Sequence, residues 1–299
     1  MGPISSLLVS PAELHHLLKA ASTAFRIVPV AAGNHSTLPS FESRHVPNSV
    51  FFNMDAVKDT NSPYPMMLPS SAQFATYMAE RGIRRDDVLV IYDTFETGLR
   101  LSPRVAWTCQ HFGHKNVHVL NNFANYVKEG FPVASGQMRT PVSSTTSEMD
   151  EATSIDPDPE ADNVITFEHL RCMVKDPSQK GKFQIIDARP NDLFSGRAAA
   201  NGASASVRLG HMPSAINVPF DSVLGLDKTF LPPAELRDQF VKWRGREDVP
   251  AVLTCNSGVT AAVVDLALRV AGLNVKTSLY DGSWSEWADR VDEDGLIVI

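Results

Sequence analysis

The chain has 299 residues, of which 43% are hydrophobic and 20% charged, a globular composition that excludes intrinsic disorder and collagen-like arrays. At about 100–200 residues per domain, this length predicts two domains, each able to bury its own core. The net charge of −7 argues against a nucleic-acid partner, because phosphate-binding proteins usually carry a basic surface.

The three cysteines, Cys109, Cys172 and Cys255, are too few and too scattered for a disulfide framework or a zinc site. Free thiols indicate a reducing compartment, and the N-terminus has no basic segment of the kind that begins a secretory signal. We therefore expect the cytoplasm, with the mitochondrion as the alternative. No apolar run approaches the roughly 18–20 residues of a membrane span, so we expect no membrane partner.

The first half, residues 1–140, is expected to form one domain. The apolar run at 88–93 predicts a buried strand that ends in an acid, Asp93. The pattern over 104–112 predicts a helix, in which we expect Cys109 to be an inert, buried thiol.

The segment 141–163 is rich in Ser, Thr, Pro and acids and nearly lacks large apolar residues, which is typical of a solvated linker. Residues 164–299 then alternate between strands and helices, which predicts an α/β domain with a mostly parallel, doubly covered sheet. We expect Cys172 to be a second buried, structural thiol. The expected strands are 183–187, 215–218, 249–254 and 275–280, and the expected helices 167–174, 232–244 and 260–271.

The two halves resemble one another. The stretch RHVPNSV around His45 matches GHMPSAI around His211, and the strand that ends in Asp93 matches the strand before Cys255. The two matches have nearly the same offset, which indicates a duplicated domain rather than a short-period repeat. We expect His45 and His211 to be structural.

Cys255 lies where the chemistry of such a fold is expected, between the carboxyl end of a strand and the start of a helix. A short glycine-containing loop beside a helix N-terminus aims backbone N–H groups inward and stabilises negative charge. A thiol there is expected to exist largely as thiolate, the form that a nucleophile requires, and a persulfide anion would gain from the same donors. The loop residues are Asn256, Ser257, Gly258, Val259 and Thr260.

Several motifs together resemble those of tandem rhodanese-domain sulfurtransferases, most closely the 3-mercaptopyruvate type. GHMP at 210–213, CNSGVTA at 255–261 and DGSWSEW at 281–287 resemble the family's GHIPG, CGSGVTA and DGSWVEW elements, and segments 51–55, 62–69 and 102–105 have counterparts in its first domain. The resemblance implies two rhodanese-like α/β domains. The first is implied to be non-catalytic, because Asp93 stands where the second has Cys255.

The family's chemistry implies that Cys255 takes sulfane sulfur from a small-molecule donor as a persulfide. The persulfide then passes it to a thiol, to cyanide or to a protein acceptor, without a metal or an organic cofactor. The thiosulfate-preferring branch carries two basic residues after its cysteine, and here Asn256 and Ser257 are neutral. That difference favours 3-mercaptopyruvate. The Ser257 hydroxyl can assist proton handling or cap the following helix.

Two arginines that bind substrate in the family are missing, since Leu193 and Ser204 stand at their aligned positions. Arg197 or Arg208 can replace them as a carboxylate clamp, or both can be solvated loop residues.

The first domain departs from the family as well. Asp55 matches the Asp of a relay found in some members, but Met66 replaces its His. Asn121 and Asn122 stand where two glycines are usual.

Other functions remain open. A protein-to-protein sulfur carrier for tRNA thiolation or a related pathway fits the loss of the small-donor arginines, and so does a non-catalytic interaction module. A cysteine phosphatase is rejected, because Ala261 stands where its loop would end in the phosphate-clamping arginine.

Overall fold

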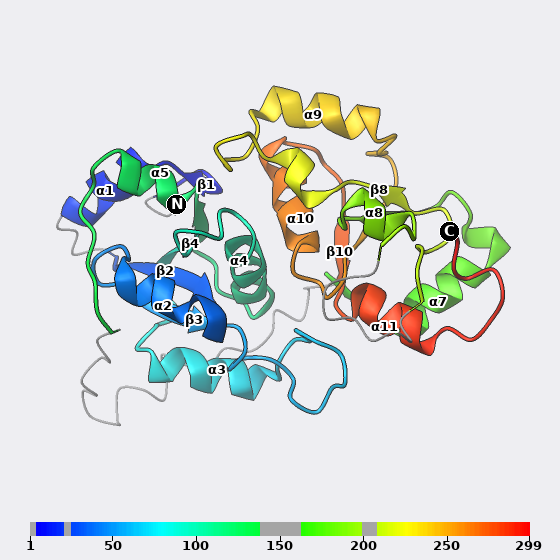
Figure 1. The fold of residues 1–299 in the computed structure, drawn as a ribbon, viewed down its shortest axis with the longest axis horizontal. Helices are drawn as coiled ribbons and strands as arrows, with labels where there is room; N and C mark the ends of the chain where they lie inside the picture. The colour runs from blue at the N-terminus through cyan, green and yellow to red at the C-terminus, as the bar shows by residue number, and fades with distance from the viewer. Residues whose placement is uncertain (1–3, 21–24, 138–162, 199–207) are drawn as a thin grey trace. The chain divides into compact units, whose positions relative to one another are not determined.

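The computed structural model describes residues 4–20, 25–137, 163–198 and 208–299 (Figure 1). The expected linker, apart from Asn163, lies outside these residues, as does Ser204. The chain divides into two compact units. Unit 1 contains most of the first half together with Asp227–Thr229, and unit 2 contains most of the second half together with Asn61–Met67.

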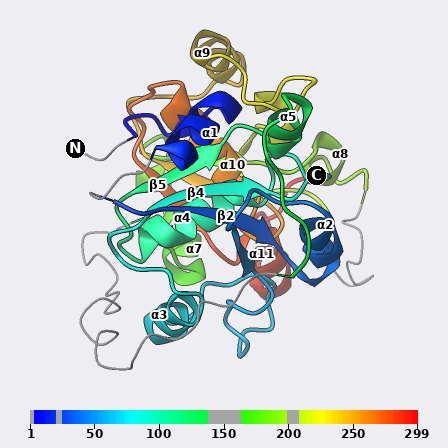
Figure 2. The ribbon, with the colours of Figure 1, turned by 90° about the vertical axis from the view of Figure 1, so that its left-hand side faces the viewer.

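Unit 1 is built on a five-stranded sheet of order β1-β5-β4-β2-β3, in which every strand pair is parallel. Figure 2 shows α1 and α5 on one side of this sheet and α3 and α4 on the other. The strands are β1 Leu8–Val9, β2 Ile27–Gly33, β3 Val50–Asn53, β4 Val88–Asp93 and β5 Val117–Leu120. The helices are α1 Pro11–Lys19, α2 Leu38–Ser43, α3 Ser71–Glu80, α4 Ser102–His111 and α5 Phe123–Lys128, with a short 3-10 helix at His35–Thr37.

Unit 2 repeats this plan, with the sheet order β6-β10-β9-β7-β8 and parallel pairing throughout. The strands are β6 Val164–Ile165, β7 Gln184–Asp187, β8 Ile216–Asn217, β9 Ala251–Thr254 and β10 Thr277–Tyr280. The helices are α7 Phe167–Lys175, α8 Asn191–Phe194, α9 Pro233–Lys242, α10 Ala261–Val270 and α11 Ser283–Arg290, with 3-10 helices at Pro177–Gln179 and Phe220–Val223. The two sheets correspond strand for strand, so the predicted α/β fold and its duplication are confirmed.

The duplication extends to the helix caps. Ser10 precedes α1 and its side chain accepts a hydrogen bond from the Glu13 N–H, and Thr166 precedes α7 and accepts one from the His169 N–H. Each cap satisfies one of the N–H groups that a helix start leaves without a partner. The same sequence signal thus starts the first helix of each unit directly after its edge strand.

The apolar strand runs form the cores, because both faces of each parallel sheet are covered. Unit 1 buries Val9, Leu14, Val88, Val90 and Tyr92 together, and unit 2 buries Leu170, Ile185, Val252, Tyr280 and Trp287 together. Cys109 is buried on α4 as predicted, but the prediction for Cys172 is wrong, because this thiol is exposed on α7. Helix α7 turns Phe167 and Leu170 inward, and Cys172 lies outside that buried stripe.

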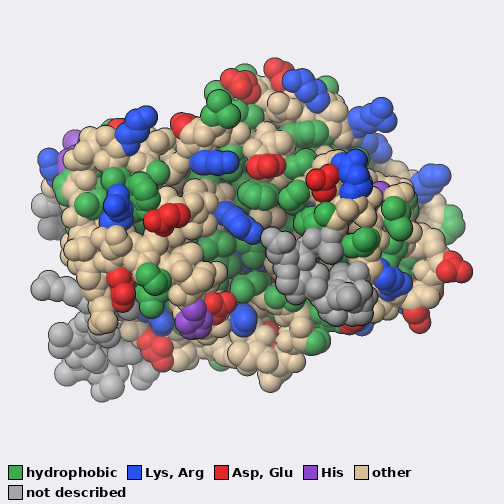
Figure 3. Space-filling view, in the orientation of Figure 1, with side chains coloured by type: hydrophobic (Ala, Val, Ile, Leu, Met, Phe, Trp, Pro, Cys, Tyr) green, Lys and Arg blue, Asp and Glu red, His purple; other side chains and the backbone are tan. Residues whose placement is uncertain are grey.

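In the part of the chain that the structure describes, no helix is long and apolar enough to cross a membrane. The same residues hold no cluster of three His, Cys, Asp or Glu side chains that could bind a metal ion. Figure 3 shows acidic and basic side chains interspersed on the face that it presents.

Candidate active site

Strand β9 places Cys255 at the carboxyl edge of the unit 2 sheet. This strand lies between β10 and β7, and its four residues are buried. Cys255 follows directly and is 1% exposed. Helix α10 begins at Ala261, so a five-residue loop from Asn256 to Thr260 separates the thiol from the helix. The predicted strand–loop–helix arrangement is present, and the loop residues named from the sequence lie together in it.

Ser283, at the start of α11, holds both ends of the loop's first turn. Its Oγ accepts hydrogen bonds from the N–H of Cys255 at 3.2 Å and of Gly258 at 3.0 Å, and donates to the Tyr280 carbonyl at 2.8 Å. Ser283 is fully buried and has a φ of 51°, an uncommon conformation for a non-glycine residue. Gly258 has a φ of 75°, which glycine adopts without steric cost.

The next two residues of α11 bind the loop's carbonyls. The Trp284 N–H donates to the Cys255 carbonyl at 3.0 Å. Ser285 donates twice to the Asn256 carbonyl, from its N–H at 3.0 Å and from its hydroxyl at 2.7 Å. The first turn of α11 is therefore bonded to four backbone groups of the active loop: the N–H groups of Cys255 and Gly258 and the carbonyls of Cys255 and Asn256.

Other donors of the loop remain available. Among the described residues, the N–H groups of Asn256, Ser257, Val259 and Thr260 have no hydrogen-bond acceptor. Thr260 is the N-cap of α10 but makes no side-chain cap, and the Ser257 hydroxyl has no partner in the described chain. Unpaired backbone donors at a helix N-terminus form a site for negative charge.

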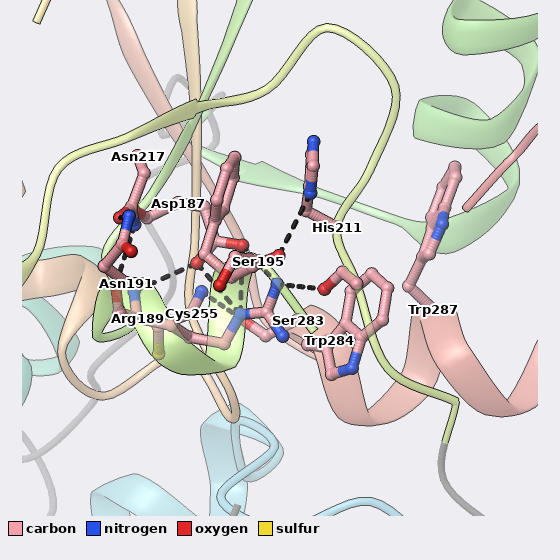
Figure 4. A network of polar contacts seen from close by, with 12 residues as sticks. Asp187, Arg189, Asn191, Ser195, His211, Asn217, Cys255, Ser283, Trp284 and Trp287 are labelled. Carbon is pink, nitrogen blue, oxygen red and sulfur yellow. Dashed lines mark hydrogen bonds and ion pairs between the residues drawn. The ribbon is translucent and has the colours of Figure 1, made fainter. Parts of the chain in front are cut away.

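A buried ion pair supports the site from the neighbouring strand. Asp187 ends β7, and the Arg189 guanidinium donates to its carboxylate at 2.6–3.0 Å while both side chains are at most 3% exposed. Arg189 also donates to the Gly210 carbonyl at 2.8 Å and lies 4.3 Å above the Trp284 ring (Figure 4). The sequence analysis missed Arg189, although an acid at a strand end followed by an arginine two residues later was a visible signal.

The two candidate clamp arginines bind their own chain. Arg197 is exposed and donates to the side chains of Asp192 and Asn191. Arg208 donates from Nε to the Ala288 carbonyl at 2.9 Å, near the end of α11. The described structure thus places neither guanidinium in a hydrogen bond with the Cys255 loop.

The two expected structural histidines occupy equivalent places. His211 stacks on Phe194 with ring centroids 3.9 Å apart, and its Nδ1 lies 3.0 Å from the Phe194 carbonyl oxygen. His45 stacks on Phe41 in the same way, at 4.3 Å, with Nδ1 2.9 Å from the Phe41 carbonyl oxygen. Each ring is therefore fixed by the residue it packs against, which fits a structural role.

Comparisons with known proteins identify the fold and the family. The rhodanese-like domain model matches residues 173–290. Thiosulfate sulfurtransferase of Gallus gallus is 35% identical to this chain over an alignment that covers 84% of this chain and 80% of the relative. Human 3-mercaptopyruvate sulfurtransferase is 32% identical over an alignment that covers 86% of this chain and 81% of the relative. Among solved structures, Saccharomyces cerevisiae Tum1 superposes with a TM-score of 0.82 at 30% identity over 97% of both chains. The sulfur transferase subunit of yeast mitochondrial complex I superposes with a TM-score of 0.78 at 31% sequence identity, and the match covers 98% of this chain and 99% of the subunit.

The chain belongs to the rhodanese sulfurtransferase family. It is an enzyme of the thiosulfate/3-mercaptopyruvate sulfurtransferase type with two tandem rhodanese folds, as the motifs predicted.

The other rhodanese unit holds a carboxylate at the position equivalent to the thiol. Asp93 ends β4, and its carboxylate accepts hydrogen bonds from the N–H of Leu101 at 2.7 Å and from the N–H and hydroxyl of Ser102. These donors lie at the N-terminus of α4. Burial raises the pKa of the Asp93 carboxyl to about 6, although its hydrogen bonds act in the opposite direction. In unit 1 the Asp93 carboxyl group therefore binds the N–H groups at the start of the helix that follows its loop.

Two departures of this rhodanese from the family have structural partners. In some family members the acid at the Asp55 position pairs with a histidine, but here Met66 stands at that histidine's place. Asp55 pairs with His35 instead, whose Nδ1 lies 2.9 Å from the Asp55 Oδ2. Asn122 has a φ of 78°, which explains why glycine is usual there. Its side chain accepts from the Ala124 N–H, at the start of α5, and donates to the Asp227 carbonyl within unit 1.

Proposed function

We propose that this rhodanese transfers sulfane sulfur through a persulfide on Cys255. The Cys255 thiolate attacks the transferable sulfur of the donor, the bond between that sulfur and the donor breaks, and the donor leaves with the electron pair. An acceptor nucleophile then attacks the outer sulfur of the persulfide, and the S–S electron pair returns to Cys255 as thiolate. The observation that supports this proposal best is the loop itself, in which a buried thiol precedes four backbone N–H groups that have no acceptor among the described residues.

The electrostatic argument comes from both units. A persulfide anion needs donors that do not have to reorient, and backbone N–H groups held at a helix N-terminus meet that requirement. In unit 1 the equivalent position is occupied by an acid, Asp93, whose oxygens accept bonds from backbone N–H groups. A negatively charged acceptor at this position of the unit 1 fold supports our proposal that the Cys255 loop of unit 2 binds a negatively charged sulfur atom.

We infer 3-mercaptopyruvate as the favoured donor, ahead of thiosulfate. Asn256 and Ser257 bring no charge to the loop, and Arg197, Arg208 and Arg189 each bind groups of their own chain. Thiosulfate carries two negative charges, and bringing it into a buried site without a cation is costly. 3-Mercaptopyruvate needs a cation for one carboxylate only, and the curated relatives include enzymes named for each donor.

The second candidate function is transfer from or to a protein persulfide, as a sulfur carrier for tRNA thiolation or a related pathway. This candidate is favoured because Arg197 and Arg208 are bonded to groups of their own chain. A persulfide on a protein brings no substrate carboxylate that an arginine would have to bind. One structural relative is the sub-stoichiometric sulfur transferase subunit of yeast mitochondrial complex I, which supports a protein partner and a mitochondrial location, with the cytoplasm as the alternative.

The deciding experiment is intact mass spectrometry after incubation with 3-mercaptopyruvate, thiosulfate or a persulfidated cysteine desulfurase. The wild type should gain the mass of one sulfur atom, and the donor that loads it fastest is the preferred one. Cys109→Ser and Cys172→Ser should load normally, whereas Cys255→Ser should not load. If Cys255→Ser gains the sulfur, another residue carries it and the assignment to Cys255 fails; if no donor loads the wild type, the persulfide proposal itself fails.

The arginines separate the two donor classes. If a small keto acid is the natural donor, Arg197→Ala or Arg208→Ala should raise KM for 3-mercaptopyruvate at least several-fold. If neither change matters, and Leu193→Arg combined with Ser204→Arg greatly increases turnover of 3-mercaptopyruvate, the protein persulfide becomes the favoured donor.

A further inference from the structure

We propose that the first turn of α11 orients the active loop and that Ser285 is a positioning residue for the persulfide. This inference rests on the proposed persulfide at Cys255. Ser285 does not follow the family's DGSWVEW pattern, which has Val at this place. Its hydroxyl and its N–H both donate to one acceptor, the Asn256 carbonyl, at 2.7 and 3.0 Å.

The effect on the sulfur site follows from peptide geometry. In a trans peptide the carbonyl of one residue and the N–H of the next point in opposite directions, and the described chain contains no cis peptide. The carbonyls of Cys255 and Asn256 point to α11, because Trp284 and Ser285 donate to them. The N–H groups of Asn256 and Ser257 therefore point away from α11, into the loop.

The remaining two bonds of this turn hold the N–H groups at the Cys255 and Gly258 positions of the loop. Ser283 binds the N–H groups of Cys255 and Gly258, so those two donors point toward α11 and do not serve the sulfur. The Asn256 and Ser257 N–H groups are consequently the first donors after Cys255 that can reach an anion. Rotation of the peptide between Asn256 and Ser257 would break both bonds from Ser285 and turn a carbonyl toward that anion.

Unit 1 provides an internal comparison. Its α5 occupies the place of α11, but within the described residues the first turn, Phe123 to Asn125, donates no hydrogen bond to the loop between Asp93 and Ser102. That unit has no thiol at the loop. The bonds from the helix to the loop are thus found in the unit that carries the cysteine.

Two isosteric variants test the role of the Ser285 hydroxyl. Ser285→Thr keeps a hydroxyl that can bind the Asn256 carbonyl, whereas Ser285→Val has the same shape without the donor. Each protein is loaded with sulfur, freed of donor and followed by intact mass spectrometry, which gives the half-life of the persulfide. Because one hydrogen bond is lost, we expect a half-life roughly three- to tenfold shorter in Ser285→Val, with Ser285→Thr close to the wild type.

The controls separate positioning from a loss of fold. Ser49→Ala removes a buried serine of unit 1 that donates to the Val46 carbonyl and accepts from Tyr92, and it should lower Tm without shortening the persulfide half-life. Ser285→Ala also removes the hydroxyl, but without introducing a β-branched side chain into α11. In steady state, Ser285→Val should lower kcat more than it changes KM.

Equal persulfide half-lives for Ser285→Thr and Ser285→Val would overturn the inference, and so would a half-life that simply follows Tm across all the variants. Failure of the proposed function looks different, because the wild type itself would then not acquire sulfur.

Discussion

The buried Asp93 should make the stability of unit 1 depend on pH. Burial raises the pKa of its carboxyl from 3.8 to about 6 in the folded chain. Between these two values the folded state binds more protons than the unfolded state, so the free energy of unfolding falls as the pH rises through this window. At about 1.36 kcal/mol per pKa unit, the loss amounts to roughly 3 kcal/mol and is complete above pH 6.

The variant Asp93→Asn removes the titration. It carries a pH-independent cost of about 1–3 kcal/mol, because its amide cannot accept every hydrogen bond that Leu101 and Ser102 donate to the carboxylate. The informative quantity is the difference in unfolding free energy between variant and wild type. That difference should shift by roughly 2.4 kcal/mol in favour of Asn between about pH 4 and pH 7.

Hydrogen exchange followed by mass spectrometry, on peptides that cover β4 and α4, measures the opening free energy of unit 1 at each pH. Asp86→Asn, in an exposed position of the same unit, is the matched control for the loss of one carboxylate. If the Asp93→Asn difference is flat with pH, or shifts in favour of the wild type as pH rises, desolvation does not dominate at this carboxyl and the reasoning is refuted.

Three further predictions concern unit 2. Ser257→Lys should improve thiosulfate use relative to 3-mercaptopyruvate by about 1–3 kcal/mol in kcat/KM, the scale of a hydrogen bond to a charged group, and an unchanged ratio would remove the loop from donor selection. Arg189→Met should lower the free energy of unfolding by about 3–5 kcal/mol in urea titrations, because the buried Asp187 carboxylate is left without its cationic partner; a loss below 1 kcal/mol contradicts this. Gly210→Ala should lower Tm by several degrees in calorimetry, since a Cβ there would lie 2.3 Å from the Val298 carbonyl oxygen, and an unchanged Tm would show that the chain relaxes freely.

Thr254 shows where tertiary packing leaves a polar group that no sequence pattern marks. Its hydroxyl is buried without a hydrogen-bond partner among the described residues, although Thr254 ends the strand β9 that the sequence predicted. Strand periodicity reports which residues are buried, but whether a buried hydroxyl finds an acceptor depends on neighbours from other elements.

Cys172 and Arg189 illustrate the two kinds of error. The helix at 167–174 was predicted, and its large apolar residues Phe167, Leu170 and Val174 recur at helical spacing on the side that faces the core. Cys172 lies off that side and is exposed, so the error came from treating the thiol as a buried residue type without placing it on the helix. Arg189 follows a predicted strand, yet its partners Gly210 and Trp284 lie far along the chain. Their contact with Arg189 arises only when the sheet and α11 assemble.

The sequence by itself determined the duplicated α/β plan and the position of Cys255 between a strand and a helix. These features are local, because strand and helix periods and the strand–loop–helix junction are written in consecutive residues. Only the tertiary structure decided which N–H groups of the loop bond to α11 and which have no acceptor among the described residues. That orientation depends on hydrogen bonds that the loop donates to Ser283 and accepts from Trp284 and Ser285. The pairing of β9 with β10 brings these three residues beside a loop nearly thirty residues earlier in the chain.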